Sequence, residues 1–203
     1  MFFYDSSELL KPVHAFSSNC YLISSGEECA VVDPSVPYDE SMVTGRVKYV
    51  LLTHSHFDHI LEIDSWVDAT GAEVIISDAE VDFLSDPRRN CYAFFDGSSR
   101  GYFGKVRGAL DGEELTLGDE RFSVMSLPGH TVGSVAYVFR DCAFVGDKVF
   151  AGGGFGRWDL PSGDMIALFG SIAKVKSLPD EMTLYCGHGE PTTVGRYKID
   201  NIR

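Results

Sequence analysis

The sequence is short of positive charge. Its 203 residues contain 17 Lys and Arg against 30 Asp and Glu, which gives a formal net charge of −13 at pH 7. Contacts from Lys and Arg to phosphate dominate the affinity of proteins for nucleic acids, so this balance argues against a nucleic-acid partner. The sequence also lacks any apolar run close to the ~20 residues that span a bilayer. We therefore expect a chain that acts on neither nucleic acid nor membrane.

Features of secreted proteins are equally scarce. Residues 1–8 contain no basic segment and acquire acidic residues early, which is not the pattern of a signal peptide. Cysteines without a C-x-x-C pair act in a reducing compartment as small buried apolar residues. The sequence therefore predicts a cytoplasmic protein without disulfides. Cys186 is two residues before His188, so it is also a candidate to lie beside a functional site. The five cysteines are Cys20, Cys29, Cys91, Cys142 and Cys186.

The length and the apolar content favour one domain over residues 1–203, with 44% hydrophobic residues to form its core. β-prone runs alternate with helical patterns along the chain. A β-hairpin is expected over residues 13–33, with its turn at Ser25-Gly26-Glu27. Further strands are expected over residues 47–53, 73–76, 114–117, 121–127, 134–139, 142–145 and 182–185.

Helices are expected in four places, each marked by start or stop residues. They are residues 37–44 before Gly45; a helix from Ile60 to Gly71 with Ile63 and Val67 on its apolar face; a helix from the capping box Ser77-x-x-Glu80 to Pro87; and a helix from the N-cap Ser162 to Pro179 with Met165, Ile166, Phe169, Ile172 and Val175 on its apolar face. Between them, residues 88–110 combine aromatics with glycines. This segment is either a loop packed on the core or a mobile wall of a pocket, with Tyr92 and Tyr102 as candidate lining residues.

Histidine is concentrated in one heptapeptide, Thr53-His54-Ser55-His56-Phe57-Asp58-His59, directly after an apolar run. Residues two apart in an extended chain point to the same side, so His54 and His56 can hold one ion, and Asp58 and His59 can face a neighbouring ion. Imidazole and carboxylate are the usual ligands of zinc and similar ions. Burying four such groups without a metal would leave polar atoms unsatisfied, so the sequence predicts metal binding.

Two further histidines, His130 and His188, lie in glycine-flanked loops after strand-like runs, whereas His14 stands apart as an ordinary histidine. The segments 29–33 and 142–147 resemble each other, and each ends in an aspartate after an apolar strand. This echo suggests two related β-rich halves that meet at the site. Asp33 is then a candidate to orient a ligand histidine, with a simple turn residue as the alternative.

The complete set, His54-x-His56-x-Asp58-His59 followed by His130, Asp147 and His188, resembles the metal ligands of the metallo-β-lactamase superfamily. The resemblance implies an α/β fold of the αββα sandwich type, with the site at one edge between two sheets. It also implies the ligand sets: His54, His56 and His130 for a first divalent ion, Asp58, His59 and His188 for a second, with Asp147 bridging.

Within the superfamily, residues 146–150, 156–161 and 187–193 resemble the glyoxalase II-like hydrolases. Residues 60–62 depart from this pattern, because family members often have glycines there. A C-terminal helical region carries much of the glutathione contact in full-length glyoxalase II, and the sequence ends at Arg203, so glutathione as part of the substrate is left open.

This resemblance implies hydrolysis at a dinuclear centre of divalent ions, zinc before iron or manganese, with Asp58 and Asp147 in the catalytic group. Two cations lower the pKa of a bridging water toward ~7, and one of them can hold the oxyanion of a tetrahedral intermediate. A thiolate leaves easily because a thiol pKa is about 8.5, so a small thioester or ester is the expected substrate. Lys148 and Arg157 are candidate anchors for an anionic substrate, with structural roles as the alternative.

Other functions remain in view. An iron-dependent dioxygenase resembling the persulfide dioxygenases of the same superfamily would need only His54, His130 and Asp147. A zinc β-lactamase is disfavoured by the absence of an export pattern and by His59 and Asp147, where the best-known ones differ. An RNA-processing nuclease is disfavoured by length and acidic charge. A structural zinc site is disfavoured because such sites are closed four-ligand cages.

Overall fold

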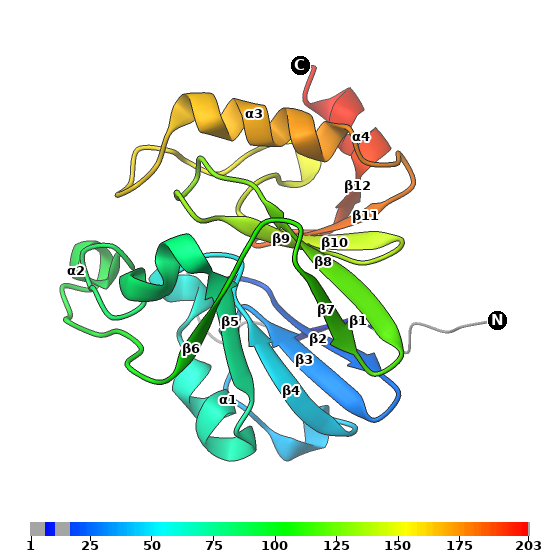
Figure 1. The fold of residues 1–203 in the computed structure, drawn as a ribbon. Helices are drawn as coiled ribbons and strands as arrows, with labels where there is room; N and C mark the ends of the chain where they lie inside the picture. The colour runs from blue at the N-terminus through cyan, green and yellow to red at the C-terminus, as the bar shows by residue number, and fades with distance from the viewer. Residues whose placement is uncertain (1–6, 11–16, 203) are drawn as a thin grey trace.

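Two sheets lie face to face, with helices on the outer side of each (Figure 1). The computed structural model describes residues 7–10 and 17–202. His14 and the first residues of the predicted hairpin lie outside these ranges. The layers run helix, sheet, sheet, helix, which is the α/β sandwich expected from the sequence, and that prediction is confirmed.

The first sheet has six strands in the order β1-β2-β3-β4-β5-β6. Its first three strands pair antiparallel, and β3 through β6 run parallel. Strands β2 to β5 match predicted strands, whereas β1 is not predicted and β6 falls within the segment that the sequence leaves as a loop. The strands are β1 (Ser7–Leu10), β2 (Cys20–Ser25), β3 (Glu28–Val32), β4 (Arg46–Leu51), β5 (Glu73–Ser77) and β6 (Val106–Ala109).

The second sheet also has six strands, in the order β12-β11-β10-β9-β8-β7. Only β10 and β11 pair parallel; the other neighbours are antiparallel. All but the short β12 match strands expected from the sequence to within a few residues. They are β7 (Glu114–Leu117), β8 (Glu120–Ser126), β9 (Val135–Val138), β10 (Cys142–Gly146), β11 (Thr183–Cys186) and β12 (Thr192–Thr193).

Alternation along the strands divides the core into three apolar layers. In β2, Tyr21 and Ile23 face the second sheet, while Cys20 and Leu22 face the helix on the outside, because successive side chains of a strand point to opposite faces. The middle layer joins both sheets through residues such as Tyr137. The two outer layers pack against helices.

Four α-helices and four short 3-10 turns complete the described chain. Helix α1 (Ile63–Thr70) covers the first sheet through Ile63 and Trp66, and α3 (Met165–Lys176) with α4 (Val194–Asp200) covers the second (Figure 1). No helix in residues 7–10 and 17–202 is long and apolar enough to cross a membrane. The remaining elements are α2 (Tyr92–Phe95), η1 (Glu40–Met42), η2 (Phe57–His59), η3 (Asp78–Phe83) and η4 (Ala151–Gly153).

Several helix predictions are wrong in detail. Residues 37–44 form only the short turn η1, and Val43 is already extended. The expected capping box opens the 3-10 turn η3, in which the Ser77 side chain makes no cap bond and which ends before Pro87. The Glu80 carboxylate does not complete the capping box because it accepts hydrogen bonds from backbone N–H groups of two other loops, which are described with the site below.

The helix after the glycine-rich loop begins two residues later than expected. Asp164, not Ser162, is its N-cap and accepts a hydrogen bond from the Ala167 N–H (2.8 Å), the usual role of a capping carboxylate. Ser162 instead accepts from the Val132 N–H (3.2 Å). The apolar face is also shifted: Leu168, Ser171, Ile172 and Val175 are buried, while Met165, Ile166 and Phe169 are exposed.

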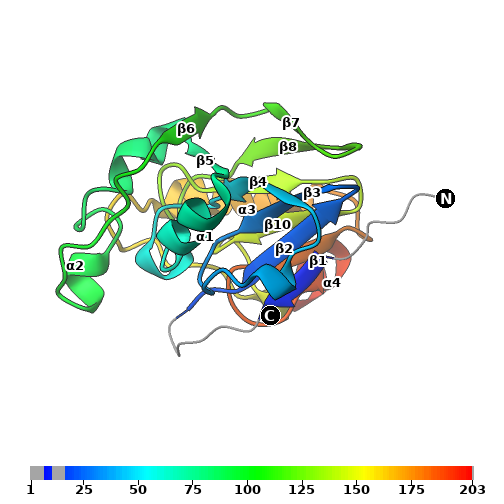
Figure 2. The same ribbon diagram turned by 90° about the horizontal axis from the view of Figure 1, so that it is seen from below.

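The two sheets contain matching halves, as the internal sequence echo suggests. In each, an antiparallel hairpin is followed by a strand that pairs parallel to its second member: β2-β3 with β4, and β9-β10 with β11. Asp33 follows β3 and Asp147 follows β10, while His54 and His188 follow the parallel partners. The view from below shows β2, β3 and β4 of the first sheet lying across β10 of the second (Figure 2).

Two glycines test the backbone conformation of the helices, and opposite changes in stability are expected for them. Gly71 ends α1 in the left-handed conformation (φ 66°), so Gly71→Ala is expected to lower the free energy of unfolding by about 1 kcal/mol. Gly170 lies exposed within α3 with nothing within 4 Å of an added Cβ, so Gly170→Ala is expected to raise it by about 1 kcal/mol. Urea denaturation of both variants measures this, and changes of the same sign would contradict it.

Candidate metal centre

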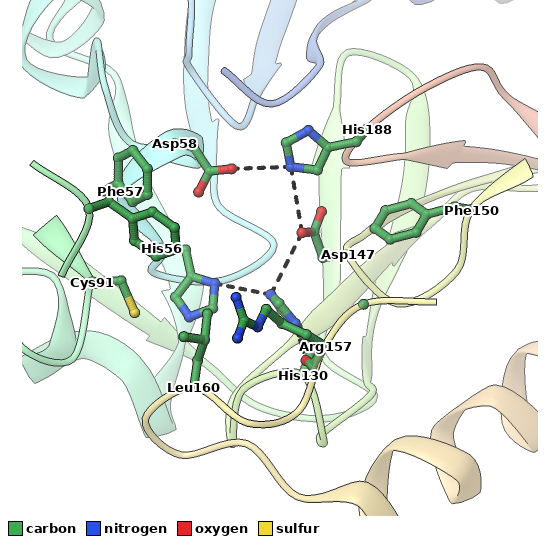
Figure 3. Close-up of a pocket in the computed structure, with 12 residues that line it drawn as sticks. His56, Phe57, Asp58, Cys91, His130, Asp147, Phe150, Arg157, Leu160 and His188 are labelled. Carbon is green, nitrogen blue, oxygen red and sulfur yellow. Dashed lines mark hydrogen bonds and ion pairs between the residues drawn. The ribbon is translucent and has the colours of Figure 1, made fainter. Parts of the chain in front are cut away.

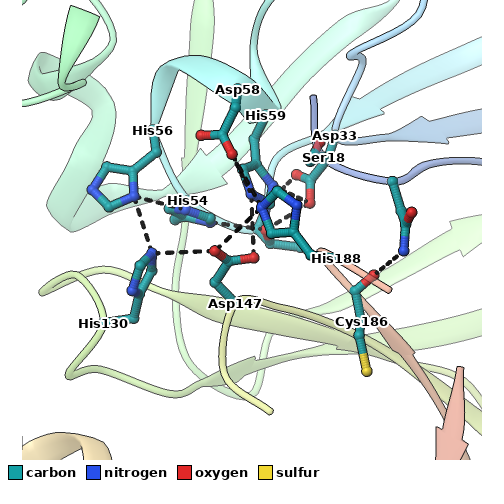
Figure 4. A network of polar contacts seen from close by, with 12 residues as sticks. Ser18, Asp33, His54, His56, Asp58, His59, His130, Asp147, Cys186 and His188 are labelled. Carbon is teal, nitrogen blue, oxygen red and sulfur yellow. Dashed lines mark hydrogen bonds and ion pairs between the residues drawn. The ribbon is translucent and has the colours of Figure 1, made fainter. Parts of the chain in front are cut away.

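All seven side chains expected from the sequence to hold metal meet at one edge of the sandwich, from loops that follow strands of both sheets (Figure 4). A backbone hydrogen bond from the Val135 N–H to the Thr53 carbonyl (2.9 Å) joins the sheets beside them. Their roles as ligands stay predictions, which the geometry below makes specific. The seven are His54, His56, Asp58, His59, His130, Asp147 and His188.

Three ring nitrogens converge in the first group. Nδ1 of His56 lies 3.1 Å from Nε2 of His54 and 3.0 Å from Nε2 of His130. Burial lowers the pKa of all three imidazoles, that of His56 to about 3. They are therefore neutral at pH 7, the form that binds a metal.

Neighbouring groups fix which nitrogen carries the lone pair in two of these rings, those of His130 and His54. His130 donates from Nδ1 to the carbonyl of Arg157 (2.6 Å), which leaves Nε2 as the acceptor. Thr53 donates its hydroxyl to Oδ2 of Asp33 (2.7 Å), so it accepts from Nδ1 of His54 (3.1 Å). Nε2 of His54 and Nε2 of His130 thus both present lone pairs to one point beside His56, which suits a cation.

A second group surrounds His59 with carboxylates. Nδ1 of His59 donates to Oδ2 of Asp33 (2.8 Å), and its Nε2 lies 3.3 Å from Asp147 and 3.8 Å from Asp58. His188 approaches Asp58 through Nε2 (3.1 Å). Burial alone would lower the pKa of His59, but the carboxylates of Asp33, Asp58 and Asp147 outweigh it and hold that pKa well above its ordinary value.

Asp147 lies between the two groups. Its Oδ2 is 3.5 Å from Nε2 of His188 and 3.7 Å from Nε2 of His130, while Oδ1 faces His59. Oδ1 of Asp147 and Nε2 of His59 are buried without a hydrogen-bond partner. Because buried polar atoms are normally satisfied, and because this donor set is that of zinc and iron sites, the residues fit two divalent cations.

Asp33 makes the contacts expected of a residue that orients this site. It is buried and adopts φ 52°, and its carboxylate accepts from the Thr53 N–H, the Thr53 hydroxyl and His59. One aspartate after β3 therefore directs a histidine of each group.

Glu80 is a functional residue that the sequence reading missed. It is fully buried; Oε2 accepts from the Ser55 N–H (2.8 Å) and Oε1 from the Gly133 N–H (2.8 Å). Ser55 lies within the first ligand segment, and Gly133 ends the loop that carries His130. The carboxylate therefore ties together the two loops that supply the first group. Its position three residues after Ser77 matches a capping box. No local sequence pattern distinguishes a glutamate that caps a helix from one that links two distant loops.

Glycine is required where loops approach the ligands. A Cβ on Gly187 would overlap Oδ1 of Asp147 and lie 2.8 Å from Cε1 of His59. A Cβ on Gly156 would lie 2.9 Å from Nδ1 of His130. These loops are packed against the ligands as closely as a main chain allows.

The centre opens into a cavity of about 430 Å³ (Figure 3). Of the other candidates, Arg157 lines it, but its guanidinium bonds both oxygens of Asp159 (2.6 and 2.7 Å). Lys148 is buried and donates to the Pro128 carbonyl (3.1 Å), so it has a structural role. Tyr92 and Tyr102 are buried in the outer layer of the first sheet, and Cys186 in that of the second. The lining is His56, Phe57, Asp58, Cys91, Phe95, His130, Asp147, Phe150, Gly156, Arg157, Leu160 and His188.

Sequence and fold place the chain in a known class. The family model of the metallo-beta-lactamase superfamily matches residues 14–188, and the chain belongs to this superfamily, whose members are mostly metal-dependent hydrolases that bind divalent ions. The resemblance found in the sequence is thereby confirmed.

Individual relatives include glyoxalase II-like proteins. The chain is 33% identical to hydroxyacylglutathione hydrolase GloC of Haemophilus influenzae, over 94% of each chain. It is similar to the crystal structure of BLEG-1 B3 metallo-beta-lactamase (TM-score 0.84, 32% identity, 94% of this chain and 95% of that one). It is also similar to TTHA1623 in a di-iron-bound form (TM-score 0.81, 30% identity, 97% and 98%).

The Glu80 carboxylate, which links the two loops that supply the first ligand group, gives a test of the site. In Glu80→Gln one acceptor oxygen becomes an NH₂ group that opposes a backbone N–H, so the two loops separate. The affinity for divalent metal is expected to fall about 10–100-fold, the usual cost of losing an outer contact of a ligand shell. Chelator competition measures it, with the exposed Glu114→Gln as the matched control. Equal affinity in the two variants would rule out this role.

Proposed function

We propose that the protein is a dinuclear metal-dependent hydrolase, glyoxalase II-like, that cleaves a small thioester or ester with two zinc ions. The observation that carries the proposal is the arrangement of two ligand groups, His54-His56-His130 and Asp58-His59-His188, on either side of Asp147 at the wall of an open cavity. A structural ion would be closed off by its ligands, whereas His56, Asp58, His130, Asp147 and His188 all line the space that a substrate can enter.

Bound cations would supply an activated water near neutral pH and polarise the scissile carbonyl. The chain's own residues prepare for this. Asp33 and the Arg157 carbonyl hold the Nδ1 protons of His59 and His130, so their Nε2 atoms face inward. Asp58 and Asp147 place carboxylate oxygens at the cavity surface, where they can accept a proton from an attacking water.

The leaving group favours a thioester. Outside the predicted metal ligands, none of the residues that line the cavity is an evident general acid: Cys91 is buried with its thiol pKa raised to about 11 by burial, and Arg157 is paired with Asp159. A thiolate needs no protonation to leave at pH 7, since a thiol pKa is about 8.5. Hydrolysis of a thioester is thus the reaction that this set of groups can complete.

Substrate and compartment are part of the proposal. The net charge of −13 disfavours nucleic acid, and the cavity volume suits a small molecule. All five cysteines lie in the described chain, are buried and carry free thiols, which supports a reducing compartment such as the cytoplasm.

Metal analysis combined with turnover tests the proposal. Protein purified without chelator is expected to hold two zinc ions per chain and to cleave S-lactoylglutathione or an uncharged thioester, and His56→Ala and Asp147→Ala are expected to lose metal and at least about a hundredfold in rate. The exposed Asp119→Asn is the control.

Three results would contradict the proposal. One iron per chain with oxygen consumption and no hydrolysis would favour the dioxygenase, and iron is a relevant metal because TTHA1623 is described in a di-iron-bound form. Hydrolysis of a β-lactam in preference to any thioester would align the protein with BLEG-1. Full metal content and rate in both ligand variants would refute the assignment of the site.

A further inference from the structure

We propose that the cavity selects thioesters that are uncharged and apolar on both sides of the scissile bond, in preference to hydroxyacyl thioesters of glutathione. This inference rests on the proposed thioester hydrolysis and names the substrate class of that site. Two independent features of the cavity carry it: the side chains that form its walls and the charges that face it.

The walls beyond the ligands are apolar. Phe57 and Phe95 stack with ring centroids 5.0 Å apart, Phe150 lies beside His188 with centroids 6.1 Å apart, and Leu160 also lines the cavity (Figure 3). Phe95 keeps 51% of its surface exposed although it lines the site. An exposed ring at the mouth of a cavity is a surface that an apolar ligand group can cover.

Apart from the metal ions, the protein's own side chains offer an anion little positive charge at the cavity. Among the described residues that line it, Asp58 and Asp147 carry carboxylates, and Arg157 is the one Lys or Arg. Both oxygens of Asp159 already bond the Arg157 guanidinium, and the neighbouring Lys148 is buried and directed to a backbone carbonyl.

Glutathione carries two carboxylates, and each loses hydration on binding unless a cation or several N–H groups replace it. Bound metal ions would face the scissile carbonyl and leave the distant carboxylates of the tripeptide unpaired. A thiol without charge avoids this cost. The cavity therefore favours an uncharged leaving thiol, and the aromatic walls favour an apolar acyl group.

Four thioesters test the preference for the acyl group and the preference for the leaving thiol independently. Phenylacetyl and lactoyl groups are each joined to N-acetylcysteamine and to glutathione, and kcat/KM is measured for all four with the metal-loaded protein. We expect phenylacetyl-N-acetylcysteamine to have the highest kcat/KM. Any other compound in first place overturns the inference while hydrolysis of a thioester stands. Cleavage of none of the four refutes the proposed thioester hydrolysis itself.

A matched pair of variants assigns the preference to the wall. Phe95→Ser removes a ring that lines the cavity, and Phe94→Ser removes the neighbouring ring, which is 62% exposed and outside the lining. Phe95→Ser is expected to raise KM for the phenylacetyl thioester about fivefold to tenfold, the effect of one aromatic contact, with kcat and lactoyl turnover little changed. Phe94→Ser is expected to leave all four values unchanged. Equal effects of the two variants on phenylacetyl turnover contradict the inference.

Discussion

The carboxylate of Asp33 contacts both ligand groups, and the geometry of the centre depends on it. It accepts a hydrogen bond from Nδ1 of His59 and another from the Thr53 hydroxyl, which in turn accepts from Nδ1 of His54. Nε2 of each histidine is thereby left to face the other predicted ligands. The position is available because β3 and β4 pair parallel, which brings the residues after both strands to one edge of the sheet. A neutral side chain at Asp33 would lose the charge that stabilises both orientations.

The second sheet repeats this arrangement with a different outcome. Asp147 follows β10, beside the parallel strand β11 that leads to His188, just as Asp33 follows β3 beside β4. In the first sheet the aspartate stays behind the histidines and orients them. In the second sheet it reaches the cavity wall between the two ligand groups. Equivalent positions in the two halves thus supply a supporting contact and a bridging candidate.

The sequence predicts most of this architecture because its signals are local. The predicted strands and the clustering of His54, His56, Asp58 and His59 depend on neighbouring residues alone, and both are present in the fold. The errors arise where distant groups compete. Glu80 satisfies N–H groups of two ligand loops instead of capping a helix. In α3, Leu168 is buried where Gly129 approaches it so closely that an added Cβ would overlap the backbone of Leu168. Contacts of this kind are fixed only once the two sheets pack.

The close packing of main chain around the ligands also limits how this protein can diverge. Gly156 and Gly187 leave no room for a side chain beside His130 and Asp147, so most substitutions there would displace a ligand before they changed a substrate contact. Phe95 and Leu160 also line the cavity, neither is a predicted ligand, and Phe95 is half exposed. New specificities within such a lineage are therefore expected to accumulate at positions such as Phe95 and Leu160, while the chemistry stays constant.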